Sequence, residues 1–347
     1  MSQREAFHQI WGRRLVSFTL YSLLGAFAFT LAPLLLVGAL AYDVLARAKG
    51  WPRVRAMVFF LLYLGCEAWG LFAAGALWLL TLGGLLVGEQ RYQDLNAGLQ
   101  RAWSSALFWG SMRVFSITVQ VEGLELAANG PMLLMVRHSS TADTVLAAAL
   151  VANPNKILLR YVLKQELLWD PCLDVVGRRL PNAFIDRAAR KRGEELALIA
   201  DLAQGIDQTS AVLIYPEGTR FSQSKRTRAL EKLKNQPALF EIAQQMQAVL
   251  PPKLAGPLSL LDASPGTDVV ILEHQGFEGA ASFGEFWGGG LVGRTLRVRL
   301  RRISAGDIPA QHRDIWLFQQ WAETDRWVRE QAAAQPPALN TPKATTP

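Results

Sequence analysis

The sequence predicts an α/β protein in which a mostly parallel or mixed sheet, flanked by helices, follows an N-terminal membrane helical hairpin. After residue 91, short β-rich apolar runs alternate with longer helical patterns. Before it lie two long apolar segments, at 15–42 and 56–88. Half of the 347 residues are hydrophobic and only 19% are charged, which is too apolar for a disordered chain and unusual for a freely soluble one. We therefore expect membrane segments over 1–90, an α/β domain over 91–335 and a disordered tail over 336–347.

The first apolar segment, 15–42, contains no charged residue between Arg14 and Asp43. At about 1.5 Å per residue, a helix of this length exceeds the hydrocarbon core of a bilayer, which is about 30 Å thick. A cleavable signal peptide is the alternative, because two arginines precede the run and Ala39-Leu40-Ala41 resembles a cleavage site. The run is much longer than the apolar core of a signal peptide, so it predicts a membrane segment.

The second apolar segment, 56–88, contains one charged residue, Glu67. It is too long for an upright span, so it must tilt, re-enter the membrane or break near Gly83 and Gly84. Glu67 then needs a partner or a place at the membrane interface. A pair of buried core helices is the alternative, which the lack of a polar stripe disfavours. Basic residues flank both segments on both sides, so their count leaves the orientation open.

The remainder of the chain carries the pattern of a layered α/β domain. Several strands read as continuous apolar runs, which is typical of a sheet covered on both faces. Only 296–301 alternates apolar residues with arginine, which predicts an edge strand with one wet face. The strands are expected at 116–121, 132–136, 157–163, 182–185, 211–215, 268–272 and 296–303, with the clearest helices at 141–152, 193–205 and 314–333.

The net charge is +7, from 36 basic and 29 acidic residues. Such an excess suits anionic lipid, a phosphate-bearing substrate or nucleic acid. The basic clusters near 187–192 and 225–234 lack interleaved aromatic residues, which argues against nucleic-acid binding. We expect these clusters to be solvated faces, some of them turned toward anionic headgroups.

The first candidate catalytic pair is His138 and Asp143, which follow the apolar run at 132–136. Five residues apart, they would lie about 140° apart around a continuous helix and could not meet. They can pair across a turn, with His138 at the strand end and Asp143 in the first turn of the next helix, where the carboxylate holds the imidazole for general-base work. Ser140 and Asp143 also satisfy a capping box, in which the acid only caps the helix.

A second candidate is the turn Pro216-Glu217-Gly218-Thr219-Arg220, which follows the apolar run 211–215. Ligands of α/β sheets bind at the carboxyl ends of strands. Arg220 could grip a phosphate through its planar guanidinium, with Glu217 positioning it. An ordinary turn with a surface ion pair is the alternative. Two weaker patterns, Lys164-Gln165-Glu166-Leu167 and Phe184-Ile185-Asp186-Arg187, also stand at strand ends.

In this order, the four patterns resemble the four-motif signature of the glycerolipid acyltransferases, in particular the 1-acylglycerol-3-phosphate acyltransferases. His138 to Asp143 and Glu217-Gly218-Thr219-Arg220 are the specific elements of that signature. The segment Leu250-Pro251-Pro252-Lys253-Leu254-Ala255-Gly256 resembles the family's proline-containing block. The resemblance covers about 115–275, and the paired apolar segments before it also look like this family.

The resemblance implies transfer of an acyl group from a thioester donor, acyl-coenzyme A or acyl-carrier protein, to the hydroxyl of a lysophospholipid. His138 would act as the general base and Asp143 would hold its ring. The family assigns recognition of the glycerol phosphate to Lys164, Arg187, Glu217, Gly218, Thr219 and Arg220. The reaction needs neither a metal nor a redox cofactor. The expected setting is a bilayer, namely a bacterial inner membrane with the catalytic domain on the cytoplasmic side.

Three alternatives accompany this interpretation. The acceptor could be another lysophospholipid or an amino-acid lipid, or the protein could be a non-catalytic lipid-binding module, although such a module has no need of the base. A serine nucleophile at Ser139 or Ser140 lacks the Gly-x-Ser-x-Gly elbow. His274, after an apolar strand, is expected to be a structural or surface residue rather than a second base.

Overall fold

The computed structural model describes residues 6–185 and 192–334, and the tail expected at 336–347 lies outside this part. The strands and longer helices fall close to their expected positions. The α-helices are α1 (Phe7–Thr30), α2 (Ala32–Leu45), α3 (Pro52–Thr81), α4 (Glu89–Phe115), α5 (Asn153–Asn155), α6 (Pro171–Val175), α7 (Arg192–Leu202), α8 (Gln223–Leu233), α9 (Pro237–Gln244), α10 (Ala255–Ala263), α11 (Phe283–Trp287) and α12 (Arg313–Ala333). The strands are β1 (Thr118–Glu122), β2 (Met132–Val136), β3 (Leu158–Lys164), β4 (Ala183–Ile185), β5 (Ser210–Ile214), β6 (Asp268–Gln275) and β7 (Thr295–Ile303).

Short helical turns connect these elements. They are η1 (Leu82–Gly84), η2 (Leu124–Ala127), η3 (Thr141–Val145), η4 (Ala148–Ala152), η5 (Gln165–Trp169), η6 (Gly177–Arg179), η7 (Glu278–Ala280) and η8 (Ala305–Asp307). The single α-helix expected at 141–152 is replaced by the 3-10 turn η3 and the π-helical turn η4. The chain after His138 is therefore wound more tightly than an α-helix in η3 and more widely in η4.

The seven strands form one mixed sheet in the order β1-β7-β6-β2-β5-β3-β4. Strands β2, β3, β4, β5 and β6 run parallel to one another, whereas β7 pairs antiparallel with β6 and carries β1 parallel beside it. This confirms the predicted mixed sheet. Because β2, β3, β5 and β6 run the same way, their carboxyl ends meet at one edge, where ligands of such sheets bind.

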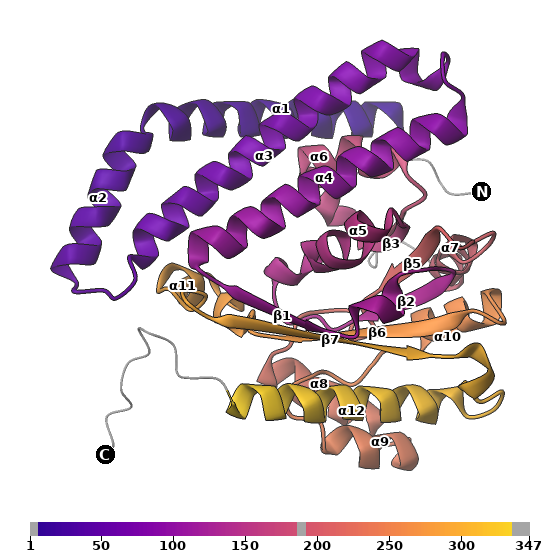
Figure 1. Ribbon diagram of the computed structural model, residues 1–347. Helices are drawn as coiled ribbons and strands as arrows, with labels where there is room; N and C mark the ends of the chain where they lie inside the picture. The colour runs from indigo at the N-terminus through magenta and orange to yellow at the C-terminus, as the bar shows by residue number, and fades with distance from the viewer. Residues whose placement is uncertain (1–5, 186–191, 335–347) are drawn as a thin grey trace, which may run out of the picture.

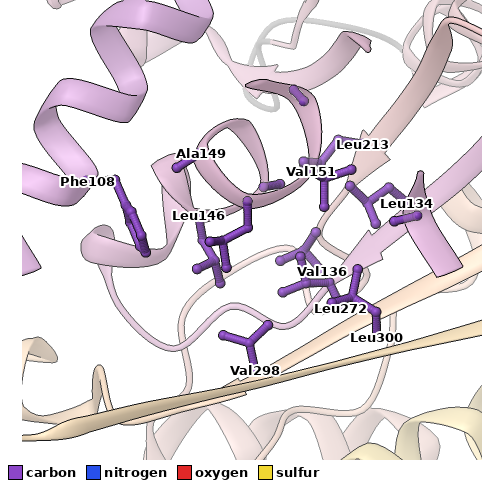
Figure 2. Close-up of a cluster of buried hydrophobic side chains, with 14 of the residues drawn as sticks. Phe108, Leu134, Val136, Leu146, Ala149, Val151, Leu213, Leu272, Val298 and Leu300 are labelled. Atoms are coloured by element: carbon purple, nitrogen blue, oxygen red, sulfur yellow. The ribbon is translucent and has the colours of Figure 1, made fainter. Parts of the chain in front are cut away.

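Apolar side chains cover both faces of the central strands. On β2, Leu134 and Val136 face a cluster that includes Phe108 of α4 and Leu146, Ala149 and Val151 of the turns after β2 (Figure 2). Leu133 and Met135 face the other cluster, which α7, α9, α10 and α12 complete. All five residues of β2 are buried, as expected for a strand covered on both faces.

The expectation of an edge strand at 296–301 is wrong, because β1 pairs along the outer side of β7. The alternation itself is present, since Leu296, Val298 and Leu300 are buried. The arginines do not face open water. Arg299 and Arg301 bind the buried carboxylate of Glu273 at 2.6 and 2.9 Å, and Arg301 also binds Glu323 of α12 at 2.9 Å. The short and mostly exposed β1 has little apolar pattern from which the pairing could be predicted.

The N-terminal helices form a layer above the sheet, opposite α8, α9 and α12 (Figure 1). The first apolar segment is not one straight helix, because the chain bends by 66° between α1 and α2. Pro33 stands in the first turn of α2, where its missing N–H removes one hydrogen bond to α1. The second segment breaks at Gly83 and Gly84, one of the three arrangements that its length allowed, and Gly83 has a φ of 67°.

Within the described residues, Pro52–Gly84 is long and apolar enough to cross a membrane, and α1 with α2 qualify only as one bent pair. Large apolar side chains on these helices are exposed, among them Trp11 and Phe27 of α1, Leu34 of α2, and Phe72 of α3. Groups of exposed large apolar side chains mark surfaces that contact a membrane or a partner. Length and composition therefore make Pro52–Gly84 a candidate membrane span, and the exposed apolar side chains around it suit a membrane or a partner.

Polar contacts attach this layer to the α/β domain around α6. Asp174 is fully buried and pairs with Arg13 at 2.9 Å, Arg14 at 2.7 Å and Arg178 at 2.8 Å. Glu67, also buried, accepts a hydrogen bond from the Cys172 backbone N–H at 3.3 Å through Oε2. The division expected at residue 91 falls in the first turn of α4, which packs with α3.

Candidate active site

His138 and Asp143 meet across the turn that follows β2. His138 Nδ1 lies 2.9 Å from Asp143 Oδ1. Asp143 Oδ2 accepts the backbone N–H groups of Ser139 at 2.7 Å and Ser140 at 2.9 Å. The capping box and the pairing with His138 therefore coexist, because each carboxylate oxygen serves one of them. His138 is partly exposed and lines a cavity, whereas Asp143 is fully buried.

The environment keeps Asp143 ionised. Burial by itself would raise the pKa of this carboxyl, but hydrogen bonds from His138 and His274 lower the pKa well below its usual range. An ionised Asp143 accepts the Nδ1 proton of His138. The ring nitrogen that can then take up a proton is Nε2.

Glu217 contacts the backbone of the turn after β2. Its Oε1 accepts the backbone N–H of His138 at 2.9 Å, and its Oε2 accepts the backbone N–H of Leu250 at 2.9 Å. The side chain is buried. Both oxygens of Glu217, which was expected at the phosphate, are turned inward to backbone amides. Burial raises the pKa of Glu217 to about 7, opposed by the charge of Arg137 and by the two N–H donors.

Gly218 allows two segments of the site to approach closely. Its φ is +67°, and a Cβ at this position would lie 2.9 Å from Nζ of Lys253. The Lys253 backbone N–H donates to the Pro216 carbonyl at 2.8 Å. A side chain at residue 218 would be strained and would displace Lys253. The glycine therefore brings the lysine of the 250–256 segment to the turn after β5.

Three more cationic side chains lie beside this turn, in addition to Lys253. Arg220 Nη1 donates to the Thr141 hydroxyl at 3.0 Å, which ties the turn after β5 to the turn after β2. Lys225 Nζ donates to the Thr219 hydroxyl at 3.1 Å and to the Arg220 carbonyl at 3.0 Å. Burial, followed by the charges of Arg220 and Lys164, lowers the pKa of Lys225. The structure therefore brings Lys164 and Arg220 together, with Lys225 as a third cation.

The sequence did not single out every residue of this site. Lys225 belongs to a basic cluster that was expected to be a solvated face, and only the fold shows that it turns back to Thr219. Arg137 carries no pattern of its own, yet it is buried and donates to Glu278 at 2.7 Å and to the carbonyl of Ala248 at 3.0 Å. Arg187, expected at the site, lies outside the described residues.

A cavity of about 1400 Å³ opens between the N-terminal helical layer and the carboxyl edge of the sheet. His138, Lys164, Gly218 and Arg220 line its polar part. Its apolar part is lined by Phe59 and Phe60 of α3, Leu107, Met112 and Phe115 of α4, and Phe277 and Phe286 beyond β6. The cavity exceeds the volume of roughly 300–1000 Å³ that is typical of small-molecule sites. It combines a histidine base, a cationic patch and a long apolar wall.

Comparisons with known proteins agree with this arrangement. Residues 118–254 match the family model described as Acyltransferase. A 1-acyl-sn-glycerol-3-phosphate acyltransferase of Pseudomonas aeruginosa is 32% identical over 121 residues, which are 34% of this chain. The chain spans 44% of the length of that relative.

The fold is similar to that in the crystal structure of the 1-acyl-sn-glycerophosphate (LPA) acyltransferase PlsC from Thermotoga maritima. The TM-score is 0.54 at 14% sequence identity, and the alignment covers 80% of this chain and 97% of that one. At this identity the likeness shows a shared fold. The family model matches residues 118–254, so this part of the chain is similar to the acyltransferase family in sequence.

Proposed function

We propose that this protein is a membrane acyltransferase that moves a fatty acyl group from a thioester donor to the sn-2 hydroxyl of 1-acyl-glycerol-3-phosphate, giving phosphatidic acid. The observation that carries the proposal is the His138–Asp143 pair, with its 2.9 Å contact, at the wall of a cavity that also holds Lys164 and Arg220. A base beside a cationic patch and an apolar wall suits a hydroxyl carried by a phosphate-bearing lipid.

The proposed chemistry is direct transfer. His138 Nε2 takes the proton of the acceptor hydroxyl while the hydroxyl oxygen attacks the thioester carbonyl carbon. Asp143, held by the two backbone amides, stabilises the imidazolium that forms. The carbon–sulfur bond then breaks, and the leaving thiolate takes the proton from His138. No acyl-enzyme forms, and because no atom is oxidised or reduced, the proposed reaction requires no redox cofactor. His138 supplies the base, so the proposed steps use no metal.

The phosphate of the acceptor would bind at the cations beside the turn after β5. Arg220 offers a planar guanidinium and Lys164 an ammonium group at the cavity wall. Lys225, held by Thr219 and the Arg220 carbonyl, adds a positive charge beside them. Three cations suit a dianionic phosphate in a partly dry cleft. The acyl chains would lie along the apolar wall formed by α3 and α4. Burial of each CH₂ group is worth about 0.8 kcal/mol, so a cavity beside the membrane spares a long chain from water.

We infer that the donor is acyl-coenzyme A or acyl-carrier protein and that the site faces the cytoplasm from a bacterial inner membrane. Both donors are made in the cytoplasm. The exposed apolar side chains of α1, α2 and α3 supply the surface that would enter the bilayer.

The test is to incubate membranes that contain the protein with labelled lysophosphatidate and each donor separately, and then to resolve the lipids. We expect labelled phosphatidate with at least one donor. Product from a zwitterionic lysolipid or an amino-acid lipid, with none from lysophosphatidate, would overturn the acceptor. No product from any acceptor would overturn the proposed activity and favour a lipid-binding module.

A further inference from the structure

His274 lies beside the catalytic pair although it is 136 residues away from His138 in the sequence. It stands near the end of β6, which pairs with β2, and its side chain is completely buried. Its Nε2 lies 2.9 Å from the carbonyl oxygen of Arg137 and 3.5 Å from Asp143 Oδ2. Of the two expected alternatives, a structural or a surface residue, the burial of His274 fits the structural one and excludes the surface one.

The two contacts define the protonation state of this ring. A carbonyl oxygen only accepts hydrogen bonds, so Nε2 of His274 must carry the proton. Within the described part of the chain, Nδ1 is buried without a hydrogen-bond partner, and a second proton there would be left unsatisfied. His274 is therefore the neutral tautomer whose Nε2–H points at the Arg137 carbonyl and at Asp143.

Asp143 is thereby surrounded by donors. Oδ1 faces His138, while Oδ2 receives the amides of Ser139 and Ser140 and faces His274. The carboxylate cannot rotate without losing one of these contacts. Its orientation in turn decides whether Nδ1 of His138 is held, and so which ring nitrogen is available as the base.

Arg137, the residue before the catalytic histidine, is hydrogen-bonded to His274 of β6. Its Nη1 donates to the His274 carbonyl at 2.6 Å, and the His274 ring donates back to the Arg137 carbonyl at 2.9 Å. This reciprocal pair of bonds fixes the peptide group that leads into His138. Both ends of the catalytic turn, the Arg137 carbonyl and the Asp143 carboxylate, thus contact one imidazole.

We propose that His274 is a positioning residue of the acyl transfer: its Nε2–H fixes the Arg137 carbonyl and the Asp143 carboxylate, and through them the orientation and tautomer of His138. The proposal rests on the proposed function, since it assigns a role within that reaction. His274 takes no part in proton transfer to substrate and is not among the residues that line the cavity.

The experiment compares three substitutions in the full-length protein. Glutamine places its amide nitrogen where His274 has Nε2, whereas asparagine reaches only the place of Nδ1, and leucine fills the space without a donor. We expect His274→Leu and His274→Asn to lower kcat about ten-fold or more, with KM for lysophosphatidate nearly unchanged. His274→Gln should return kcat to within about three-fold of the wild type.

A second readout does not depend on activity. The Nδ1 proton of His138, hydrogen-bonded to Asp143, should give a downfield proton resonance, and the chain has only four histidines among which to assign it. The resonance should persist in His274→Gln and vanish in His274→Leu and His274→Asn. His8→Gln, an exposed histidine of α1, is the matched control and should change neither kcat nor the resonance.

Two results would overturn the proposal. One is a His274→Leu variant that keeps both kcat and the resonance. The other is an equal loss in the glutamine and asparagine variants, which would mean that His274 only fills space, even if His274→Leu folds poorly. If wild-type protein transfers no acyl group to any acceptor, the proposed function fails, while the resonance still tests the hydrogen-bond geometry.

Discussion

The carboxylate of Glu217 accepts the backbone N–H of His138 at 2.9 Å, so the acid of the turn after β5 supports the turn that carries the base. The other oxygen of this carboxylate accepts the backbone N–H of Leu250, at the start of the 250–256 segment. One buried acid thus joins three segments that are distant in sequence. Its position explains why an acid stands beside Gly218 and Arg220 without reaching the cavity.

We predict that Glu217→Gln lowers kcat about ten- to a hundred-fold while KM for lysophosphatidate stays nearly constant. The glutamine carbonyl can accept only one of the two backbone N–H groups, and its own NH₂ opposes the other, so the turn that carries His138 loosens. Steady-state kinetics with varied lysophosphatidate measure this. A raised KM with an unchanged kcat would instead indicate that Glu217 helps to bind the phosphate of lysophosphatidate.

The same variant should change how stability depends on pH. Burial raises the pKa of folded Glu217 to about 7 from 4.5, so between these values the folded state holds a proton that the unfolded state has lost. Stability from this group is full below pH 4.5 and falls as pH rises toward 7, by on the order of 3 kcal/mol. We expect denaturant titrations to show this decline in the wild type and a flatter curve in Glu217→Gln. Parallel curves would contradict the buried titration.

The cationic patch gives a prediction about the acceptor. Arg220→Lys, Lys164→Ala and Lys225→Ala should each raise KM for lysophosphatidate several-fold or more, and should change KM for the acyl donor much less. Lys234→Ala, directly after α8, is the matched control, because Lys234 is exposed and its ammonium group pairs with Glu231 at 2.8 Å. Equal effects on both substrates would show that these cations do not select the phosphate.

The apolar wall gives a prediction about chain length. Ser111 of α4 lines the cavity, so a phenylalanine there would fill space that a chain needs. We expect Ser111→Phe to reduce kcat/KM for long-chain substrates far more than for short-chain ones. Ala106→Phe, on the exposed side of the same helix, is the control. An unchanged ratio of long-chain to short-chain kcat/KM in Ser111→Phe would place the chains elsewhere.

The ion pairs of Asp174 predict that α1 belongs to the catalytic unit. Removing Arg13 and Arg14 together leaves the buried carboxylate with Arg178 alone among its three arginines, and breaking such buried pairs typically costs about 3–5 kcal/mol. We expect Arg13→Ala/Arg14→Ala to lower Tm and to impair transfer to long-chain acceptors more than to short-chain ones. Wild-type Tm and chain preference in the double variant would show that α1 is only a tether.

The sequence predicted much of this site, because its main pieces follow continuous apolar strands. The pairing of His138 with Asp143 follows from a strand end and a five-residue spacing, and the meeting of Lys164 with Arg220 follows from parallel strands. The inward turn of Glu217 could not be predicted, because it depends on backbone amides of other segments. His274 and Lys225 reach the site only through the pairing of β6 with β2 and the path of α8, which no local pattern specifies.

The same reasons explain the outcomes in the fold. The break at Gly83 and Gly84 has a local cause, so the sequence could offer it as one of three arrangements of the long apolar segment. The bend between α1 and α2 also has a local cause, Pro33. It was not predicted, because the apolar run continues without a break across this proline. The place of β7 inside the sheet depends on β1, whose five residues are mostly exposed.

The central claim is that His138 is the base of an acyl transfer. Its most direct test is the rate at which purified His138→Ala protein forms phosphatidate from lysophosphatidate and the acyl donor that the wild-type protein uses. The imidazole is partly exposed at the cavity wall, and the amides of Ser139 and Ser140 still hold Asp143 in the variant, so Tm and membrane binding should stay close to wild-type values. We predict a fall in kcat of about 10² to 10⁴, the usual cost of losing a general base. A well-folded His138→Ala protein that keeps more than about a tenth of the wild-type rate would contradict the account.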